Sequence, residues 1–150
     1  MIAYPDTSFL CALYRRQDNS PEAAAYFKSM TEELHVSSLL LFEFRQSLRF
    51  QVWLHAQNPN KGFPQVDCDG ALGKLQLNMD MGAVVIVPVD WSEVHQIAEK
   101  LSANHTRTRG QRAFDLLHIA TALHLDARDF LSFDDRQREL AKKERLKVKP

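Results

Sequence analysis

The sequence predicts an α/β fold, a three-layer α/β/α sandwich around a central parallel sheet. Short apolar segments with strand character alternate along the chain with longer segments of helical periodicity, and this alternation is typical of βαβ units. A length of 150 residues with 45% hydrophobic residues fits one domain, spanning residues 1–150, with one continuous core.

The first half of the chain is expected to begin with a strand that stops at a proline. Ser20, Pro21 and Glu22 have the residue types of an N-cap and a first helical turn, so a helix should begin there. The segment NPNKGFPQ should end a long helix, because it combines glycine, prolines and asparagines. In order, we expect a strand at 2–5, helices at 6–14 and 20–30, a strand at 34–38, and helices at 39–57 and 66–81.

The second half begins with AVVIVPV at 83–89, the clearest buried strand of the sequence. Asp90 then has the position of an N-cap, with Glu93 placed as in a capping box, so we interpret Asp90 as a structural residue. After the expected loop HTRTRG come a helix at 111–125, a core strand at 127–133 and a closing helix at 134–145. The basic tail KKERLKVK is expected to fray rather than to contact RNA.

Composition excludes several classes of protein. Nineteen basic residues balance nineteen acidic ones, so binding to a nucleic acid would have to use local patches. Cys11 and Cys68 have no metal-binding or disulfide spacing and are expected to be reduced thiols. The N-terminus lacks the pattern of a signal peptide, and no apolar run is long enough for a membrane span. We therefore expect a cytoplasmic protein without contact to a membrane.

Four acidic residues, Asp6, Glu43, Asp115 and Asp134, lie inside or against apolar runs. An isolated buried carboxylate is disfavoured by several kcal/mol unless it is paired or coordinates a metal. Asp6 directly follows the first expected strand and Asp134 the last. In a parallel sheet both then lie at the carboxyl ends of the strands, where ligands bind.

Each acid also has a structural interpretation when it is taken alone. Asp6 and Asp134 could be N-caps, Asp115 could offset a helix dipole, and Glu43 could lie at a helix boundary. Asp135 could replace Asp134 in either role. Only when the four acids are considered together does a shared site explain their positions better than four separate structural roles.

Other polar residues near these acids also allow two interpretations. His118, on an otherwise apolar helix, is more typical of a satisfied core histidine than of a metal ligand. Arg107, Arg109 and Arg112 precede the Asp115 helix and belong either to a solvated loop or to a phosphate contact.

Carboxylates without histidine or cysteine ligands favour hard cations such as Mg²⁺ or Mn²⁺. A pair of such ions can activate water and stabilise the oxygens of a phosphodiester during cleavage. A phosphatase with an aspartyl-phosphate intermediate is disfavoured, because Ser8 occupies the position where a second Asp commonly lies. The glycine-rich loops of nucleotide-triphosphate and dinucleotide sites are absent from the sequence.

The motifs resemble the PIN-domain family, and within it the VapC-type ribonuclease toxins. The resemblance covers residues 2 to about 146 and rests on these elements: Asp6-Thr7-Ser8 after the first strand, Glu43 in the third helix, FDLLHIA at 114–120, and Ser132-Phe133-Asp134 after the fourth strand. It implies an endoribonuclease dependent on Mg²⁺ or Mn²⁺, frequent homodimers, and in many members a small antitoxin that blocks the acidic site.

By this resemblance Asp6, Glu43, Asp115 and Asp134 form the catalytic, metal-coordinating set, and Thr7, Ser8 and Ser132 support it through hydrogen bonds. Ser132 favours Asp134 over Asp135 as the fourth ligand. Arg107, Arg109 and Arg112 are the candidate RNA contacts. We expect the toxin of a type II toxin–antitoxin pair; the alternatives are a PIN-like module that binds RNA or protein without cutting, or a metal-dependent phosphatase.

Overall fold

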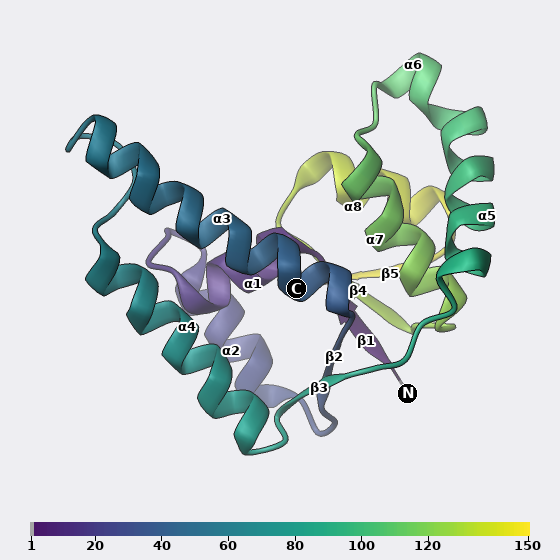
Figure 1. The fold of residues 1–150 in the computed structure, drawn as a ribbon. Helices are drawn as coiled ribbons and strands as arrows, with labels where there is room; N and C mark the ends of the chain where they lie inside the picture. Colours follow the sequence, from purple (N-terminus) through teal and green to yellow (C-terminus); the bar gives the residue numbers. More distant parts are fainter. Residues whose placement is uncertain (1) are drawn as a thin grey trace.

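The computed structural model describes residues 2–150, which form a five-stranded parallel sheet with helices packed around it (Figure 1). The order of the strands across the sheet is β3-β2-β1-β4-β5. The strands are β1 (Ala3–Pro5), β2 (Leu34–Val36), β3 (Val84–Ile86), β4 (Asp129–Leu131) and β5 (Lys147–Lys149). The α/β/α class expected from the sequence is confirmed, with one strand more than predicted.

The helices fall into two groups in Figure 1, with α1–α4 together and α5–α8 together. Contacts between α3 and α4 join the first group, and contacts between α5 and α7 join the second. The helices are α1 (Thr7–Tyr14), α2 (Ser20–Ser29), α3 (Ser38–Gln57), α4 (Gln65–Asp80), α5 (Trp91–Leu101), η1 (Ser102–Thr106), α6 (Arg107–Arg109), α7 (Ala113–His124) and α8 (Asp135–Lys143).

Strand β1 lies at the centre of the sheet and fixes the position of Asp6. Ala3 is paired with both neighbouring strands, whereas Pro5 is paired only with β4, at Leu131. A proline has no N–H to donate to a ladder, so the pairing with β2 ends before it. The Asp6 amide then donates to the Leu131 carbonyl at 2.9 Å. Asp6 therefore emerges at the carboxyl end of the central strand.

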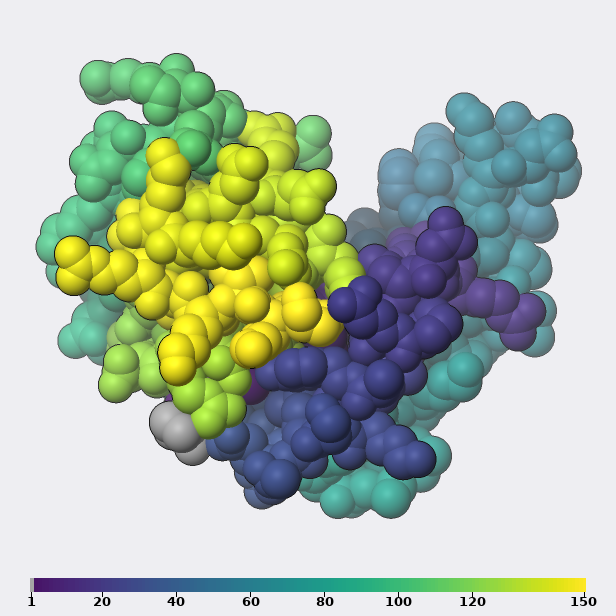
Figure 2. Space-filling view, turned by 180° about the vertical axis from the view of Figure 1, so that it is seen from behind, coloured from purple at the N-terminus to yellow at the C-terminus, as the bar shows by residue number. Residues whose placement is uncertain are grey.

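The two edges of the sheet differ from expectation. The segment at 83–89 was predicted to be a buried strand, but only β3 forms, it lies at an edge, and Ile86 is 53% exposed. The tail was expected to fray, but it forms β5 beside β4. Arg138 Nη1 donates to the Pro150 carbonyl at 3.2 Å and so holds the end of the chain. Figure 2 shows this yellow segment packed over one face of the molecule.

Two further details concern helix boundaries. The expected loop HTRTRG is helical, in η1 and α6, and Gly110 ends it with a positive φ of 61°. The prediction for Asp90 is confirmed, because its side chain accepts the amides of Ser92 and Glu93 at 3.0 and 3.2 Å at the start of α5. Helix α2 begins at Ser20, but its N-cap is Asn19 rather than the serine.

The core lies between the sheet and the helices and is rich in aromatic rings, with Tyr4, Phe9, Phe44 and Phe130 fully buried. Phe133 stacks on Phe9, with ring centroids 6.0 Å apart. This contact fixes the connection between β4 and α8 against α1, and with it the residues on either side of Phe133. No helix within residues 2–150 has the length and apolarity to cross a membrane.

Candidate metal centre

The four acids predicted from the sequence lie near the N-termini of four helices. Asp6 is the N-cap of α1 and Asp134 the N-cap of α8, Asp115 lies in the first turn of α7, and Glu43 lies in the second turn of α3. Strands β1, β2 and β4 lead into three of these helices. The partial positive charge at a helix N-terminus favours nearby carboxylates. The fold therefore offsets part of the cost of gathering negative charge at this edge of the sheet.

Asp6 is the most deeply buried of the four, at 2% exposure. Its Oδ1 accepts hydrogen bonds from the Ser8 hydroxyl at 2.6 Å and the Phe9 amide at 3.0 Å, and its Oδ2 accepts from the Ser132 hydroxyl at 2.5 Å. Burial raises the pKa of Asp6, and these three hydrogen bonds oppose the shift only in part. Within residues 2–150 no lysine or arginine pairs with this carboxylate.

Ser8 and Ser132 also join the two ends of the sequence. The Ser8 hydroxyl accepts from the Phe133 amide at 2.9 Å, and the Ser132 hydroxyl accepts from the Asp134 amide at 3.1 Å. The two hydroxyls lie 3.3 Å apart. The serines therefore hold the start of α1 and the start of α8 in one hydrogen-bonded network around Asp6.

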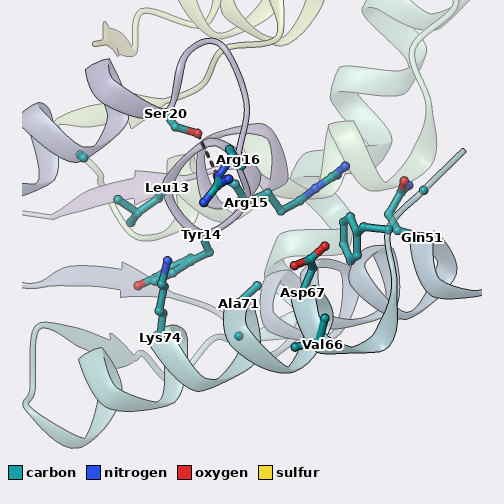
Figure 3. Close-up of a pocket in the computed structure, with 14 residues that line it drawn as sticks. Leu13, Tyr14, Arg15, Arg16, Ser20, Gln51, Val66, Asp67, Ala71 and Lys74 are labelled. Atoms are coloured by element: carbon teal, nitrogen blue, oxygen red, sulfur yellow. Dashed lines mark hydrogen bonds between the residues drawn. The ribbon is translucent and has the colours of Figure 1, made fainter. Parts of the chain in front are cut away.

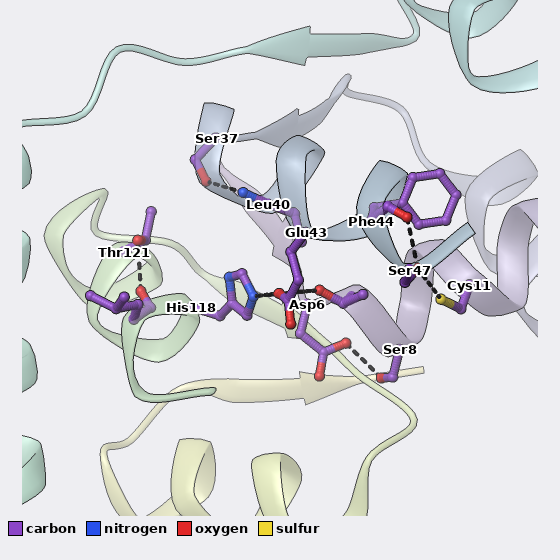
Figure 4. A network of polar contacts seen from close by, with 12 residues as sticks. Asp6, Ser8, Cys11, Ser37, Leu40, Glu43, Phe44, Ser47, His118 and Thr121 are labelled. Atoms are coloured by element: carbon purple, nitrogen blue, oxygen red, sulfur yellow. Dashed lines mark hydrogen bonds and ion pairs between the residues drawn. The ribbon is translucent and has the colours of Figure 1, made fainter. Parts of the chain in front are cut away.

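Glu43 points toward α7 and contacts His118 (Figure 4). Its Oε2 accepts a hydrogen bond from the Thr7 hydroxyl at 2.6 Å and makes a close contact with Nε2 of His118. Burial alone would raise the pKa of Glu43, but the hydrogen bond and charge of His118 and the Thr7 hydroxyl outweigh it, and the pKa is lowered.

His118 is the polar residue that the sequence analysis interpreted as a core histidine in preference to a metal ligand. It is buried, at 1% exposure, as a core histidine would be, but its ring contacts an acid on another helix. The available signal was its position three residues after Asp115, which places both side chains on one face of α7.

Asp115 lies within electrostatic range of two other acids of the set. Burial raises the pKa of Asp115, and the charges of Asp134 and Glu43 raise it further, against smaller opposing effects of His118 and Arg112. Asp134 is exposed, and its Oδ1 accepts the Gln137 amide at 3.0 Å as the N-cap of α8. Asp135 is the first residue of α8, is exposed, and is not among the largest influences on the pKa of Asp115.

The three candidate RNA-binding arginines differ in their surroundings. Arg112 is exposed directly before α7, close enough to lower the pKa of Asp115. Arg109 pairs with Glu139 at 3.1 Å, and Arg107 is exposed on α6. Of the three, Arg112 is the one whose charge is among the larger influences on the pKa of an acid of the set.

The donor set fits a hard divalent cation in its chemistry, because the carboxylates supply only oxygen. The raised pKa values of Asp6 and Asp115 mark carboxylates that a cation would stabilise. Within residues 2–150 no three His, Cys, Asp or Glu side chains already stand in metal-binding geometry. Binding would therefore require side chains such as Glu43 or Asp134 to adjust.

A cavity of about 680 Å³ lies elsewhere, between the end of α1 and helices α3 and α4 (Figure 3). Arg15, Arg16, Asp67 and Lys74 are among its charged residues, and Arg15 lies 5.3 Å from the centroid of the Phe63 ring. None of the predicted site residues lines this cavity.

The PIN domain family model matches residues 3–143, so the chain belongs to the PIN-domain family. Among solved structures it is similar to VapBC-1 from nontypeable Haemophilus influenzae, at 16% identity and a TM-score of 0.65 over 99% of this chain and 97% of the other. It is also similar to VapC20 of Mycobacterium tuberculosis, described as a sarcin-ricin loop cleaving toxin, at 17% identity and a TM-score of 0.64 over 91% and 93%.

FitAcB from Neisseria gonorrhoeae is similar as well, at 16% identity and a TM-score of 0.62 over 99% of this chain and 97% of that one. No curated protein matches the chain. At these identities the solved structures establish the fold, and together with the family match they support a nuclease.

Proposed function

We propose that this protein is a single-domain endoribonuclease, dependent on Mg²⁺ or Mn²⁺, that hydrolyses RNA phosphodiester bonds with a metal-activated water. Asp6 and Asp115 would hold the main ion, and Glu43 and Asp134 would complete its ligands or hold a second ion. The bound ion would supply an activated water and stabilise negative charge on the phosphodiester. Ser8 and Ser132 would orient Asp6, and Thr7 would orient Glu43.

The observation that carries this proposal is the electrostatic environment of Asp115. Burial and the charges of two other acids raise its pKa, and those acids come from different helices. A purely structural acid has no need of two like charges nearby, since each of them destabilises its ionised form. A shared divalent cation accounts for the whole group.

Arg112 supports RNA as the substrate, because it lies directly before α7, its charge acts on Asp115, and a guanidinium is suited to bind a phosphate of the substrate. We extend the same role to Arg107 and Arg109. For Arg109 this requires exchange of its ion pair with Glu139, whose carboxylate is largely exposed.

We also propose a small antitoxin as partner, because the similar structures include VapBC and FitAB assemblies. Homodimerisation is proposed as well. It is supported by large exposed apolar side chains on α3, where Phe42, Phe50 and Trp53 are 58%, 48% and 55% exposed. Such residues are typical of protein interfaces. Light scattering coupled to gel filtration measures the dimer, and co-purification with the product of an adjacent reading frame tests the antitoxin.

The test of activity is cleavage of a fluorogenic RNA with Mg²⁺ or Mn²⁺ and with EDTA. We expect Asp6→Asn and Asp115→Asn each to reduce cleavage by at least 100-fold, because each removes a charged ligand, while far-UV circular dichroism stays unchanged. Asp80→Asn is the matched control, since Asp80 is exposed on α4 and its carboxylate accepts, among the described residues, only the Gln76 amide. Equal cleavage by the wild type and both site variants would refute the nuclease proposal.

The second candidate is a PIN-like module that binds RNA without cutting it. It is favoured by the present contact of Glu43 with His118 rather than with a set of metal-binding side chains. Calorimetric titration with Mn²⁺ separates the two functions, because a pure binding module requires no carboxylate-dependent uptake of metal.

A further inference from the structure

We propose that His118 is a positioning residue: together with Thr7 it holds one oxygen of Glu43, so that the other oxygen is presented to the metal ion. This inference rests on the proposed metal site and assigns a task there to a buried histidine on α7.

The geometry places two donors on the same oxygen. The Thr7 hydroxyl lies 2.6 Å from Oε2 of Glu43, Nε2 of His118 contacts the same atom, and the two donors are 3.4 Å apart. An ionised carboxylate only accepts hydrogen bonds, so both groups donate to it. Oε1 of Glu43 has no hydrogen-bond partner within residues 2–150, which leaves it available to a cation.

Burial fixes the tautomer of His118. The ring is 1% exposed, and its Nδ1 is buried without a partner. A proton on Nδ1 would leave a buried donor without a partner, and it would also set the lone pair of Nε2 against a carboxylate oxygen that can only accept. The proton of the neutral ring therefore lies on Nε2, where Glu43 accepts it. With Nε2 engaged in this way and Nδ1 enclosed by protein, His118 acts through Glu43 and not as a ligand itself.

Positioning matters because Glu43 is a long, half-buried side chain on a helix separate from Asp6 and Asp115. Side chains that form hydrogen bonds to a metal ligand typically contribute 10- to 100-fold to metal affinity. Thr7 and His118 come from α1 and α7, so they tie α3 to the two helices that carry the main ligands.

The test is the dissociation constant for Mn²⁺, measured by calorimetry on the purified full chain without RNA. We expect His118→Leu to weaken binding 10- to 100-fold, because it removes the donor. His118→Gln should stay within about threefold of the wild type, because its amide can still donate. His95→Leu, at an exposed position on α5, should have no effect.

A double-mutant cycle shows whether His118 acts through Glu43. In the Glu43→Gln background, His118→Leu should cause no further loss of affinity. The same loss in both backgrounds would mean that the histidine contacts the metal directly, and would overturn the proposal. Wild-type affinity in His118→Leu would overturn it as well.

Folding is checked by thermal unfolding in EDTA. If His118→Leu does not fold, Thr7→Val removes the other donor of the pair at a partly exposed position and is expected to weaken Mn²⁺ binding in the same direction. Unchanged affinity in Thr7→Val then counts against the proposal. If the wild type binds Mn²⁺ but does not cleave RNA, the proposed nuclease activity is refuted, and the affinities of the variants still decide the role of His118. If the wild type binds no Mn²⁺, both the nuclease activity and the role of His118 are refuted.

Discussion

Asp6 combines two roles that sequence reasoning treated as alternatives. It caps α1 through the Phe9 amide, and it also presents a buried carboxylate with two serine donors at the carboxyl end of β1. A cap alone would be served equally well by an exposed side chain. The burial of Asp6 is therefore the part of its environment that capping leaves unexplained.

The coupling between Asp115 and Asp134 can be measured directly. We predict that Asp134→Asn lowers the pKa of Asp115 in the metal-free protein, because one of the like charges that raise it is removed. The pKa can be followed by NMR of the carboxyl carbon. Asp135→Asn is the matched control and should change that pKa less, because Asp135 is not among the largest influences on it. A larger shift from Asp135→Asn would reverse the assignment of the two acids.

The four acids were predicted as site residues because each lies in or against an apolar run of the sequence. Asp6 and Asp134 were placed on the same side of the sheet because each directly follows an expected strand. The contact between Glu43 and His118 could not be predicted in this way. The two residues are 75 positions apart on different helices, and an apolar helix face gives no information about which helix packs against it. Only the folded chain brings them together, where Glu43 reaches from α3 to the His118 ring on α7.

At the scale of the element, substitutions of Asp134 at the start of α8 can distinguish its role as an N-cap from its proposed role as a metal ligand. We predict that Asp134→Ala lowers the free energy of unfolding of the metal-free protein by about 1 kcal/mol, because the Gln137 amide loses its acceptor. Asp134→Asn should keep most of that stability, because its amide oxygen can still accept. Both variants should weaken Mn²⁺ binding. Urea unfolding and calorimetry give the two quantities, and equal stability of both variants would contradict the capping role.

The C-terminal strand provides a second prediction at this scale. Leu146 is buried at 8% exposure just before β5, so Leu146→Ala should lower the free energy of unfolding by roughly 2 kcal/mol. A frayed tail would show no loss. Lys147→Ala is the control, because Lys147 is exposed and a surface substitution typically changes stability by less than about 0.5 kcal/mol. Urea denaturation of the two variants measures the difference.

Both edge strands show why element prediction was incomplete. The segment around β3 is strongly apolar, and an apolar run does not reveal whether a strand lies at the centre or at the edge of a sheet. The segment of β5 alternates lysines with Val148, which is too short and too polar for a strand signal. Lysines on an edge strand are common, since they discourage pairing with other chains. Strands β1 and β4, in contrast, are buried at every position, in agreement with the apolar segments from which they were predicted.

At the scale of the whole molecule, the chain has equal numbers of acidic and basic residues, yet it brings several carboxylates together at one site. Parallel strands direct their carboxyl ends to one edge, and the helices that follow begin there, so Asp6, Glu43 and Asp134 gather as a consequence of topology. The metal-free fold therefore carries a local repulsion, which a divalent cation would convert into attraction.

The burial of Asp6 predicts that Asp6→Asn stabilises the metal-free protein and destabilises the metal-bound protein, each relative to the wild type. Burial raises the pKa of Asp6, so the folded state disfavours its ionised form, and stability is lost as pH rises from the ordinary value of 3.8 through the raised pKa. In EDTA at pH 7, Asp6→Asn should therefore melt above the wild type, and the gap should close as pH falls below about 4.

With Mn²⁺ at 100 times its dissociation constant, the wild type should gain about 2.7 kcal/mol while the variant gains little, which reverses the order. Thermal unfolding with Mn²⁺ and with EDTA measures both signs. Asp80→Asn should follow the wild type throughout, because its carboxylate is exposed on α4. If Asp6→Asn gains as much stability from Mn²⁺ as the wild type does, Asp6 is not a ligand, and its burial requires another explanation.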